Sequence, residues 1–93
     1  VVFRILSPLS MAEKLELYIM TLKKGGVLKS KAHASGAEEF LTVLDGSVSV
    51  ELGEKRAALD EGDTINFHAD VDHIISNARD GESKLYMVVK YSG

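Results

Sequence analysis

The 93-residue sequence contains no cysteine and only one proline. A chain without cysteine forms neither a disulfide framework nor a thiolate metal site, and it suits a reducing cytoplasm. Any metal that it binds must therefore be held by nitrogen and oxygen ligands. The scarcity of proline, together with short apolar stretches between turn residues, favours a fold made mainly of β-strands.

The sequence also lacks basic clusters and long apolar runs. Its net charge is -3, with 11 basic and 14 acidic residues interspersed, so it offers no basic stripe for nucleic acid and no Lys/Arg-rich amphipathic helix for a membrane surface. Apolar runs such as Met87-Val88-Val89 are far shorter than the roughly 20 residues that cross a bilayer, and no signal peptide pattern opens the chain. We expect a soluble, cytoplasmic protein that binds no membrane and does not bind DNA by itself.

The length of the chain supports one hydrophobic core. A domain of 93 residues buries about 60 to 65% of its unfolded surface, which leaves no room for a second core. We therefore treat residues 1–93 as one domain. Because the sequence begins at Val1 and not at methionine, we expect a fragment of a longer protein or a processed chain.

β-favouring residues recur in short segments that turn signals separate. The segment Leu15–Leu22 mixes β-branched and aromatic residues and ends at two lysines and two glycines, which favour a turn. The segments Phe40–Leu44 and Ser47–Leu52 flank Asp45-Gly46. An Asp-Gly pair between two apolar runs predicts a β-hairpin with a type I′ turn, in which both central residues need a positive φ.

Seven or eight short strands at regular spacing predict an all-β sandwich or closed barrel. Strict alternation in the segment after Asp45-Gly46 places Val48, Val50 and Leu52 on a buried face. The segment Pro8–Lys14 is the only helical competitor, and its length favours a loop or one helical turn. The remaining expected strands are 55–59, 63–68, 73–77 and 84–91.

Two stretches carry a resemblance to the cupins, a family whose fold is a small jelly-roll β-barrel. Glu39, followed by six residues and Gly46, matches the second half of the first cupin motif. In the second motif, Gly62, His73 and Asn77 keep every spacing, and His68-Ala69-Asp70 replaces the usual Pro-x-Gly. The resemblance covers nearly the whole chain and implies a single small jelly-roll β-barrel.

The histidine pair that opens the first cupin motif is altered in this sequence. Counting back from Glu39, His33 falls on the first histidine and Ser35 replaces the second, whereas counting from Gly26 leaves no histidine in the pair. In the first frame the resemblance implies that His33, Glu39 and His73 retain three of four ligand positions. Imidazole and carboxylate groups suit a divalent transition metal such as Zn²⁺, Mn²⁺, Fe²⁺ or Ni²⁺. The alternative is that Glu39 and His73 line a polar interior and hydrogen-bond to each other.

Strand parity and motif position assign roles to the neighbouring polar residues. Adjacent strand residues point to opposite faces, so Glu39 is expected to point inward and Glu38 to be solvated. His68 occupies a turn position and is expected at the surface, and Asn77 is expected to hydrogen-bond structurally at a strand end. Tyr18 is a candidate ligand-binding residue. Several other large side chains could line a pocket but more often form the core: Met20, Phe67, Tyr86 and Met87.

A narrower resemblance points to a function. Four stretches are similar to the C-terminal cupin of bacterial helix-turn-helix (XRE-type) transcriptional regulators. They are Phe3–Pro8, Leu15–Tyr18, residues 33–39, where a single histidine is followed by two small residues, Gly and Glu-Glu, and Ala69–His73. The resemblance implies an effector-sensing, homodimeric domain that binds a small polar metabolite through His33, Glu39, His73 and Tyr18. DNA would be bound by an N-terminal domain absent from this chain.

Two other functions remain open. The same three ligand candidates could hold a catalytic metal in a small cupin enzyme of the isomerase or dioxygenase type. The domain could also be a dimerisation barrel whose polar interior binds nothing. Measured turnover, metal content and ligand binding would distinguish the three functions.

Overall fold

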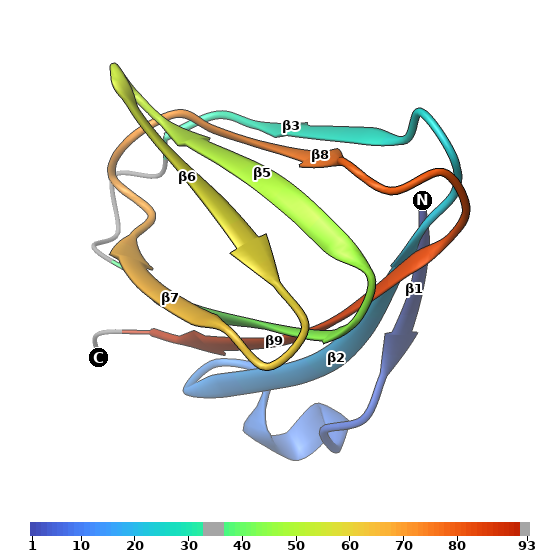
Figure 1. Ribbon diagram of the computed structural model, residues 1–93. Coiled ribbons are helices and arrows are strands. Elements are labelled where there is room, and N and C mark those ends of the chain that lie inside the picture. The colour runs from blue at the N-terminus through green and yellow to red at the C-terminus, as the bar shows by residue number, and fades with distance from the viewer. Residues whose placement is uncertain (33–36, 92–93) are drawn as a thin grey trace.

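The computed structural model describes residues 1–32 and 37–91. This part of the chain contains nine β-strands and one turn of 3-10 helix, η1 (Figure 1). In chain order the elements are β1 (Val2–Ile5), η1 (Leu9–Met11), β2 (Leu15–Leu22), β3 (Val27–Ser30), β4 (Glu38–Asp45), β5 (Ser47–Leu52), β6 (Lys55–Asp60), β7 (Thr64–His68), β8 (His73–Asn77) and β9 (Ser83–Lys90). The all-β prediction is confirmed.

The strands form two antiparallel sheets that face each other (Figure 1). Sheet A has the order β1-β2-β9-β4-β7, and sheet B has the order β3-β8-β5-β6. Strands of the described ranges pair through their backbones only within their own sheet, so the two sheets are not joined into one continuous barrel. The two-sheet arrangement is consistent with the expected jelly roll.

Alternating apolar residues on the inner faces of the two sheets form the core. In β4, Leu41 and Val43 are buried, and in β5, Val48 and Val50 are buried, as the alternation predicts. Leu52, also expected on that face, is half-buried. Each fully buried aliphatic side chain contributes about 1.5 to 3 kcal/mol relative to an exposed one, which makes this shared core the main source of stability. The rest of the main cluster consists of Met20, Leu22, Leu59, Phe67, Ile75, Leu85 and Met87.

The predicted hairpin at Asp45-Gly46 is wrong. β4 pairs with β7 and β9, whereas β5 pairs with β6 and β8, so the chain changes sheets at this turn. Gly46 has a φ of +96°, but no non-glycine residue of the described ranges has a positive φ, which excludes a type I′ turn. A Cβ added to Gly46 would lie 2.8 Å from the Cβ of Ser83. The Asp-Gly pair therefore forms a tight corner between sheets, packed against β9.

Two short strands were not predicted, and one local prediction is confirmed. β1 and β3 have only four residues each, which is too short for a clear period-two pattern. In β3, half of the residues are polar as well. The segment Pro8–Lys14 forms only the single turn η1, as expected. Within residues 1–32 and 37–91, no helix has the length and apolar character needed to cross a membrane.

Candidate functional site

A cavity of about 290 Å³ lies between the sheets at the end where β9 finishes and β4 and β8 begin. We call this the cavity end; it is the end at which β9 finishes in Figure 1. The residues that line the cavity come from both sheets: Tyr18, Ser30, Ala37, Glu39, Ala69, His73, Val89 and Tyr91. Its volume is at the lower limit of typical small-molecule pockets, which start at about 300 Å³.

Glu39 places a buried carboxylate in this cavity. It is the second residue of β4 and pairs with Phe67 of β7 and Val89 of β9, both buried, so strand parity directs all three side chains inward. Glu39 is 6% exposed, whereas its neighbour Glu38 is half-buried. The prediction that Glu39 points inward is confirmed, and Glu38 is less solvated than expected.

His73 meets Glu39 from the opposite sheet. It begins β8, is 3% exposed, and packs its ring 5.0 Å from that of Phe67. Its Nδ1 lies 3.3 Å from the carbonyl oxygen of Val71, and its Nε2 lies 3.4 Å from Oε2 of Glu39. In the tautomer whose Nδ1 donates to Val71, Nε2 turns a lone pair toward the carboxylate. The buried imidazole and carboxylate of the two sheets thus meet inside the cavity.

Two tyrosines complete the polar lining. The Tyr91 hydroxyl donates a hydrogen bond to Oε1 of Glu16 on β2. This hydrogen bond, partial burial, and the negative charges of Glu16 and Glu39 raise the pKa of Tyr91 to about 12. Burial raises the pKa of Tyr18, and the same two carboxylates raise it further. Both phenols therefore stay neutral at physiological pH in a negative local field.

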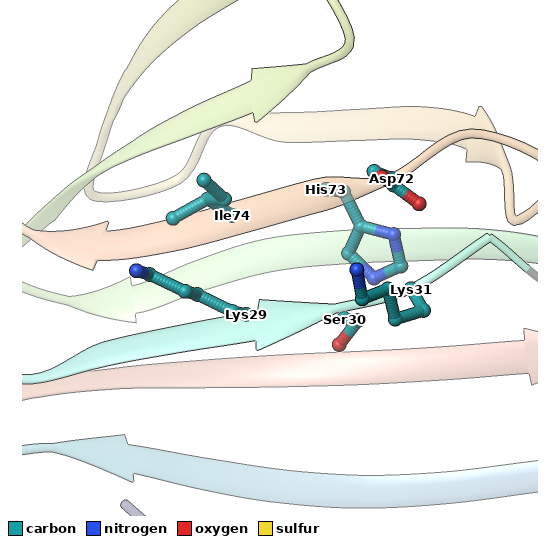
Figure 2. A pocket seen from close by; sticks show the side chains of 6 residues that line it. All are labelled: Lys29, Ser30, Lys31, Asp72, His73 and Ile74. Carbon is teal, nitrogen blue, oxygen red and sulfur yellow. The ribbon is translucent and has the colours of Figure 1, made fainter.

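A second, outer pocket of about 230 Å³ adjoins the cavity (Figure 2). Its lining consists of Lys29, Ser30, Lys31, Asp72, His73 and Ile74. Figure 2 shows the His73 ring extending from β8 toward β3, and Ser30 is the register partner of His73 on that strand. Asp72 accepts a hydrogen bond from the backbone N–H of Ala32 at 2.7 Å, which holds the end of β3 in place. His73 and Ser30 line both spaces. The outer pocket also contains Lys29 and Lys31, whereas the cavity contains Glu39.

A scan against family models matches residues 18–89 to the cupin domain. The chain belongs to the cupin family. No curated protein matches the sequence. The cupin resemblance drawn from the sequence is confirmed, and the motif residues Glu39 and His73 are the two that the fold brings together in the cavity.

Solved structures resemble this cupin over its whole length. A HTH_3 family transcriptional regulator from Vibrio cholerae has a TM-score of 0.88 and 26% identity, covering 98% of this chain and 51% of that one. The Cupin_2 domain of an XRE family transcriptional regulator from Enterobacter cloacae has a TM-score of 0.90 and 20% identity, covering 99% of this chain and 97% of that one. The cupin domain of Schizosaccharomyces pombe Cnp3 has a TM-score of 0.83 at 11% identity, covering 97% of this chain and 60% of that one. This chain thus spans about half of the Vibrio cholerae protein.

The predicted metal set of this cupin is described only in part. His33, its third member, lies outside the described residues. Within residues 1–32 and 37–91, no three His, Asp or Glu side chains are grouped so that they could hold a metal ion. Metal binding by His33, Glu39 and His73 therefore stays a prediction.

The other cupin motif residues lie where their expected roles place them. His68 is exposed, as expected of its turn position. Asn77 ends β8 and donates to the carbonyls of Lys23 at 2.9 Å and Gly81 at 2.7 Å, while its Oδ1 accepts a bond from the Ser83 hydroxyl at 2.7 Å. The structural role predicted for Asn77 is confirmed. We call the region of Gly46, Asn77 and Ser83 the corner end.

Sequence reasoning missed three polar residues of the cavity region. Tyr91 follows Val89 by two positions and shares its face, so strand parity could have identified it. Ser30 could not be found, because its role depends on an unpredicted strand. Glu16 gave no signal, since its importance comes from its bond to Tyr91. Of the other pocket candidates, Met20, Phe67 and Met87 are buried in the core, and Tyr86 is half-buried.

Proposed function

We propose that this cupin is the effector-sensing and dimerising domain of a bacterial transcriptional regulator. The observation that carries the proposal is the cavity between the sheets, in which Tyr18, Glu39 and His73 present polar groups to a small enclosed space. A cavity with an apolar surround and a few convergent polar groups is typical of small-molecule sites. The predicted ligand residue Tyr18 lines the same cavity as Glu39 and His73, which supports their assignment to one site.

The relatives of known structure support a regulatory setting. The Vibrio cholerae protein is named as a transcriptional regulator, and this chain aligns with about half of it at 26% identity. We infer that the cupin acts with a separate helix-turn-helix domain that contacts DNA, since the net charge of -3 disfavours DNA binding by the cupin itself. Effector binding changes DNA binding only if the effector has different affinities for two arrangements of the protein.

The donor set of the cavity fits a divalent transition metal. Glu39 supplies a carboxylate and His73 an imidazole nitrogen 3.4 Å apart, a separation suited to two ligands that each bind one ion at about 2.1 Å. His33 is the proposed third ligand. A bound ion would supply coordination positions open to a polar group of the effector.

The surface near the N-terminus supports dimerisation with a second copy of the chain. Phe3 and Ile5 on β1 pair with Met20 and Tyr18 of β2 and so lie on the inner face of sheet A, yet they are 49% and 64% exposed. β1 is also an edge strand with one unpaired side, which can accept another strand. The other large apolar side chains exposed in this segment are Val1, Val2, Leu6, Leu9 and Met11. An exposed apolar edge strand fits a symmetric dimer contact.

A metabolite screen by thermal shift tests the sensing function. We expect at least one small polar metabolite to raise the melting temperature of the parent protein, and to lose this effect in Tyr18→Phe or His73→Ala. Asn77→Ala, changed on the same strand as His73 but at the corner end, serves as the control and keeps the ligand response. A broad metabolite library that stabilises neither the metal-free nor the metal-loaded protein would sink the sensing proposal.

Metal content and oligomeric state test the two remaining parts. We expect stoichiometric metal in protein purified without added ions and its loss in His73→Ala; an empty, folded parent protein removes the metal from the proposal.

Sedimentation of the parent is expected to show a dimer that Ile5→Glu dissociates. Leu44→Glu, which changes an exposed leucine away from β1, is expected to leave the dimer intact.

A further inference from the structure

We propose that the outer pocket binds the carboxylate or phosphate group of a small organic anion, whose uncharged part extends into the adjoining cavity. The inference rests on the proposed sensing function of that cavity and gives its effector a negative charge. The outer pocket has a volume of about 230 Å³, which corresponds to about seven water molecules at roughly 30 Å³ each. This space accommodates one acidic group together with bound water.

The positive charges of the site lie in the outer pocket. Lys29 and Lys31 line this pocket, whereas none of the described residues that line the cavity is a lysine or arginine. One carboxylate, that of Asp72, also lines the outer pocket, and it accepts the backbone N–H of Ala32 at 2.7 Å. Two ammonium groups beside a single carboxylate attract an anion to the outer pocket.

The two lysine side chains are available to a ligand. Both are exposed, and within residues 1–32 and 37–91 neither takes part in an ion pair or a side-chain hydrogen bond. An anion that enters the pocket therefore displaces only water from their ammonium groups. Lysine binds carboxylate and phosphate as a point charge, so either acid fits. Because a single exposed ion pair contributes little, the two lysines are expected to act together.

The backbone of β3 places the lysines next to the entrance of the cavity. Alternation along an extended chain directs Lys29 and Lys31 to one side and Ser30 to the other. Figure 2 shows both ammonium groups above β3 and the Ser30 hydroxyl below it. Ser30 and His73 are register partners and line both spaces, so the outer pocket and the cavity meet at this pair. A ligand held by the lysines can thus extend past the pair into the cavity.

The cavity suits the uncharged part of such a ligand. Ala37, Ala69 and Val89 form a small apolar cluster against which Tyr18 and Tyr91 pack, and all five residues line the cavity. Methylene groups gain by contact with these side chains. The site therefore offers apolar contacts in the cavity and positive charge outside it, which fits a short chain with one acidic end.

A matched ligand series tests the inference. The chain is titrated at low salt with n-butyl phosphate, n-butyrate and n-butanol while backbone amide resonances are recorded. Each titration is run on the protein as purified and after removal of metal by a chelator and dialysis. We expect both anions to shift the resonances of Lys29 and Ile74 in the outer pocket and of Ala69 and Val89 in the cavity. Their affinities should exceed that of the alcohol roughly 5-fold or more, with the phosphate the tighter ligand.

Removal of the two lysine charges is the decisive change. The double variant Lys29→Gln/Lys31→Gln is expected to lower the affinity for both anions to that of the alcohol. The control, Lys55→Gln/Lys84→Gln, removes two charges from exposed lysines that line neither space, and it should bind the anions as the parent does. Added sodium chloride should weaken anion binding by the parent and leave binding of the alcohol unchanged.

Each outcome bears on one proposal separately. Anion binding that survives Lys29→Gln/Lys31→Gln, or that disappears when metal is removed, overturns the inference, because another group or the metal then holds the anion. Equal affinities of the parent for the anions and the alcohol, or no shift with any compound, also overturn it. The metabolite screen decides the sensing function independently: stabilisation by an uncharged or cationic metabolite alone would keep the sensing function and contradict the anionic effector.

Discussion

The two ends of β8 carry polar side chains with opposite surroundings. At the cavity end, Nε2 of His73 lies 3.4 Å from Oε2 of Glu39, and both side chains line the cavity. At the corner end, Asn77 ties together the β2–β3 and β8–β9 connections through short bonds to backbone carbonyls. Both residues lie within the stretch that matches the cupin domain, residues 18–89. Four positions of one strand thus separate a side chain available to a ligand from one used to close the fold.

The difference shows how burial alone misleads about function. Ser83 at the corner end and Glu39 at the cavity end are both almost inaccessible to water. Ser83 exchanges bonds with Asn77 and Ser47 at the point where the chain changes sheets, whereas Glu39 brings a charge against an imidazole and two phenols. Placing a charged group there costs stability, which selection accepts where a site needs it. Stability measurements should therefore separate the two ends.

The largest effect is expected from Gly46→Ala at the corner end. The added Cβ would lie 2.8 Å and 3.0 Å from the Cβ and Cα of Ser83, and the φ of +96° disfavours any side chain. We expect a loss of about 3 kcal/mol or more in the free energy of unfolding, measured with guanidinium chloride. Gly53→Ala is the control, because its φ is +59° and its added Cβ has no neighbour within 4 Å; it should cost about 1 kcal/mol. Equal losses would contradict tight packing at the corner.

Asn77→Ala is expected to have the next largest effect. It removes the amide donor from the carbonyls of Lys23 and Gly81, which costs about 2 kcal/mol when such groups are partly buried. Ser76→Ala, next to it on β8, should change the free energy of unfolding by less than about 0.5 kcal/mol. If the two variants unfolded at the same denaturant concentration, the hydrogen bonds of Asn77 would not contribute to stability as described above.

Tyr91→Phe probes the edge of the cavity through its pH dependence. Removal of the hydrogen bond to Glu16 should cost about 1 kcal/mol near neutral pH. The folded-state pKa of Tyr91, about 12, lies above the ordinary tyrosine value of 10.0, so its stabilising contribution is complete below pH 10 and is lost as the pH rises toward 12. Denaturation of parent and variant at several pH values should therefore show a constant difference up to pH 10 that shrinks above it. A difference in the free energy of unfolding that grew with pH would mean that folding lowers the pKa of Tyr91 and does not raise it.

The smallest effect on stability is expected from Glu39→Gln at the cavity end. A neutral amide of the same shape avoids burying a charge, so the free energy of unfolding without ligand should stay constant or rise by up to about 1 kcal/mol. Denaturation of Glu38→Gln in parallel controls for loss of charge on the same strand. A loss above about 2 kcal/mol for Glu39→Gln alone would make Glu39 a structural residue like Asn77 and erase the contrast between the ends.

Strand parity predicted the part of the site that depends on one strand alone. The choice of Glu39 over Glu38 needs only the period of two, and the structure buries Glu39. The approach of His73 to Glu39 came from the cupin resemblance, because periodicity in two distant strands does not determine their register.

Features that depend on pairing between strands were not predictable in this way. An Asp-Gly pair signals a reversal of the chain, but it carries no information on whether the flanking strands bond to each other or to strands elsewhere. Here Asp45 and Ser47 continue into different sheets. The contribution of Ser30 to the cavity likewise depends on β3, a four-residue strand that pairs only with β8.

The position of β9 has a consequence for the time course of folding. β9 is the last strand in the sequence but lies in the middle of sheet A, between β2 and β4. Sheet A therefore cannot assemble until a contact forms between segments near the two ends of the chain, and such distant pairings slow folding. Tyr18 of β2 and Val89 of β9 line the same cavity, so the cavity exists only after this slow step. A chain still emerging from the ribosome has no site for an effector until β9 has been synthesised and has docked.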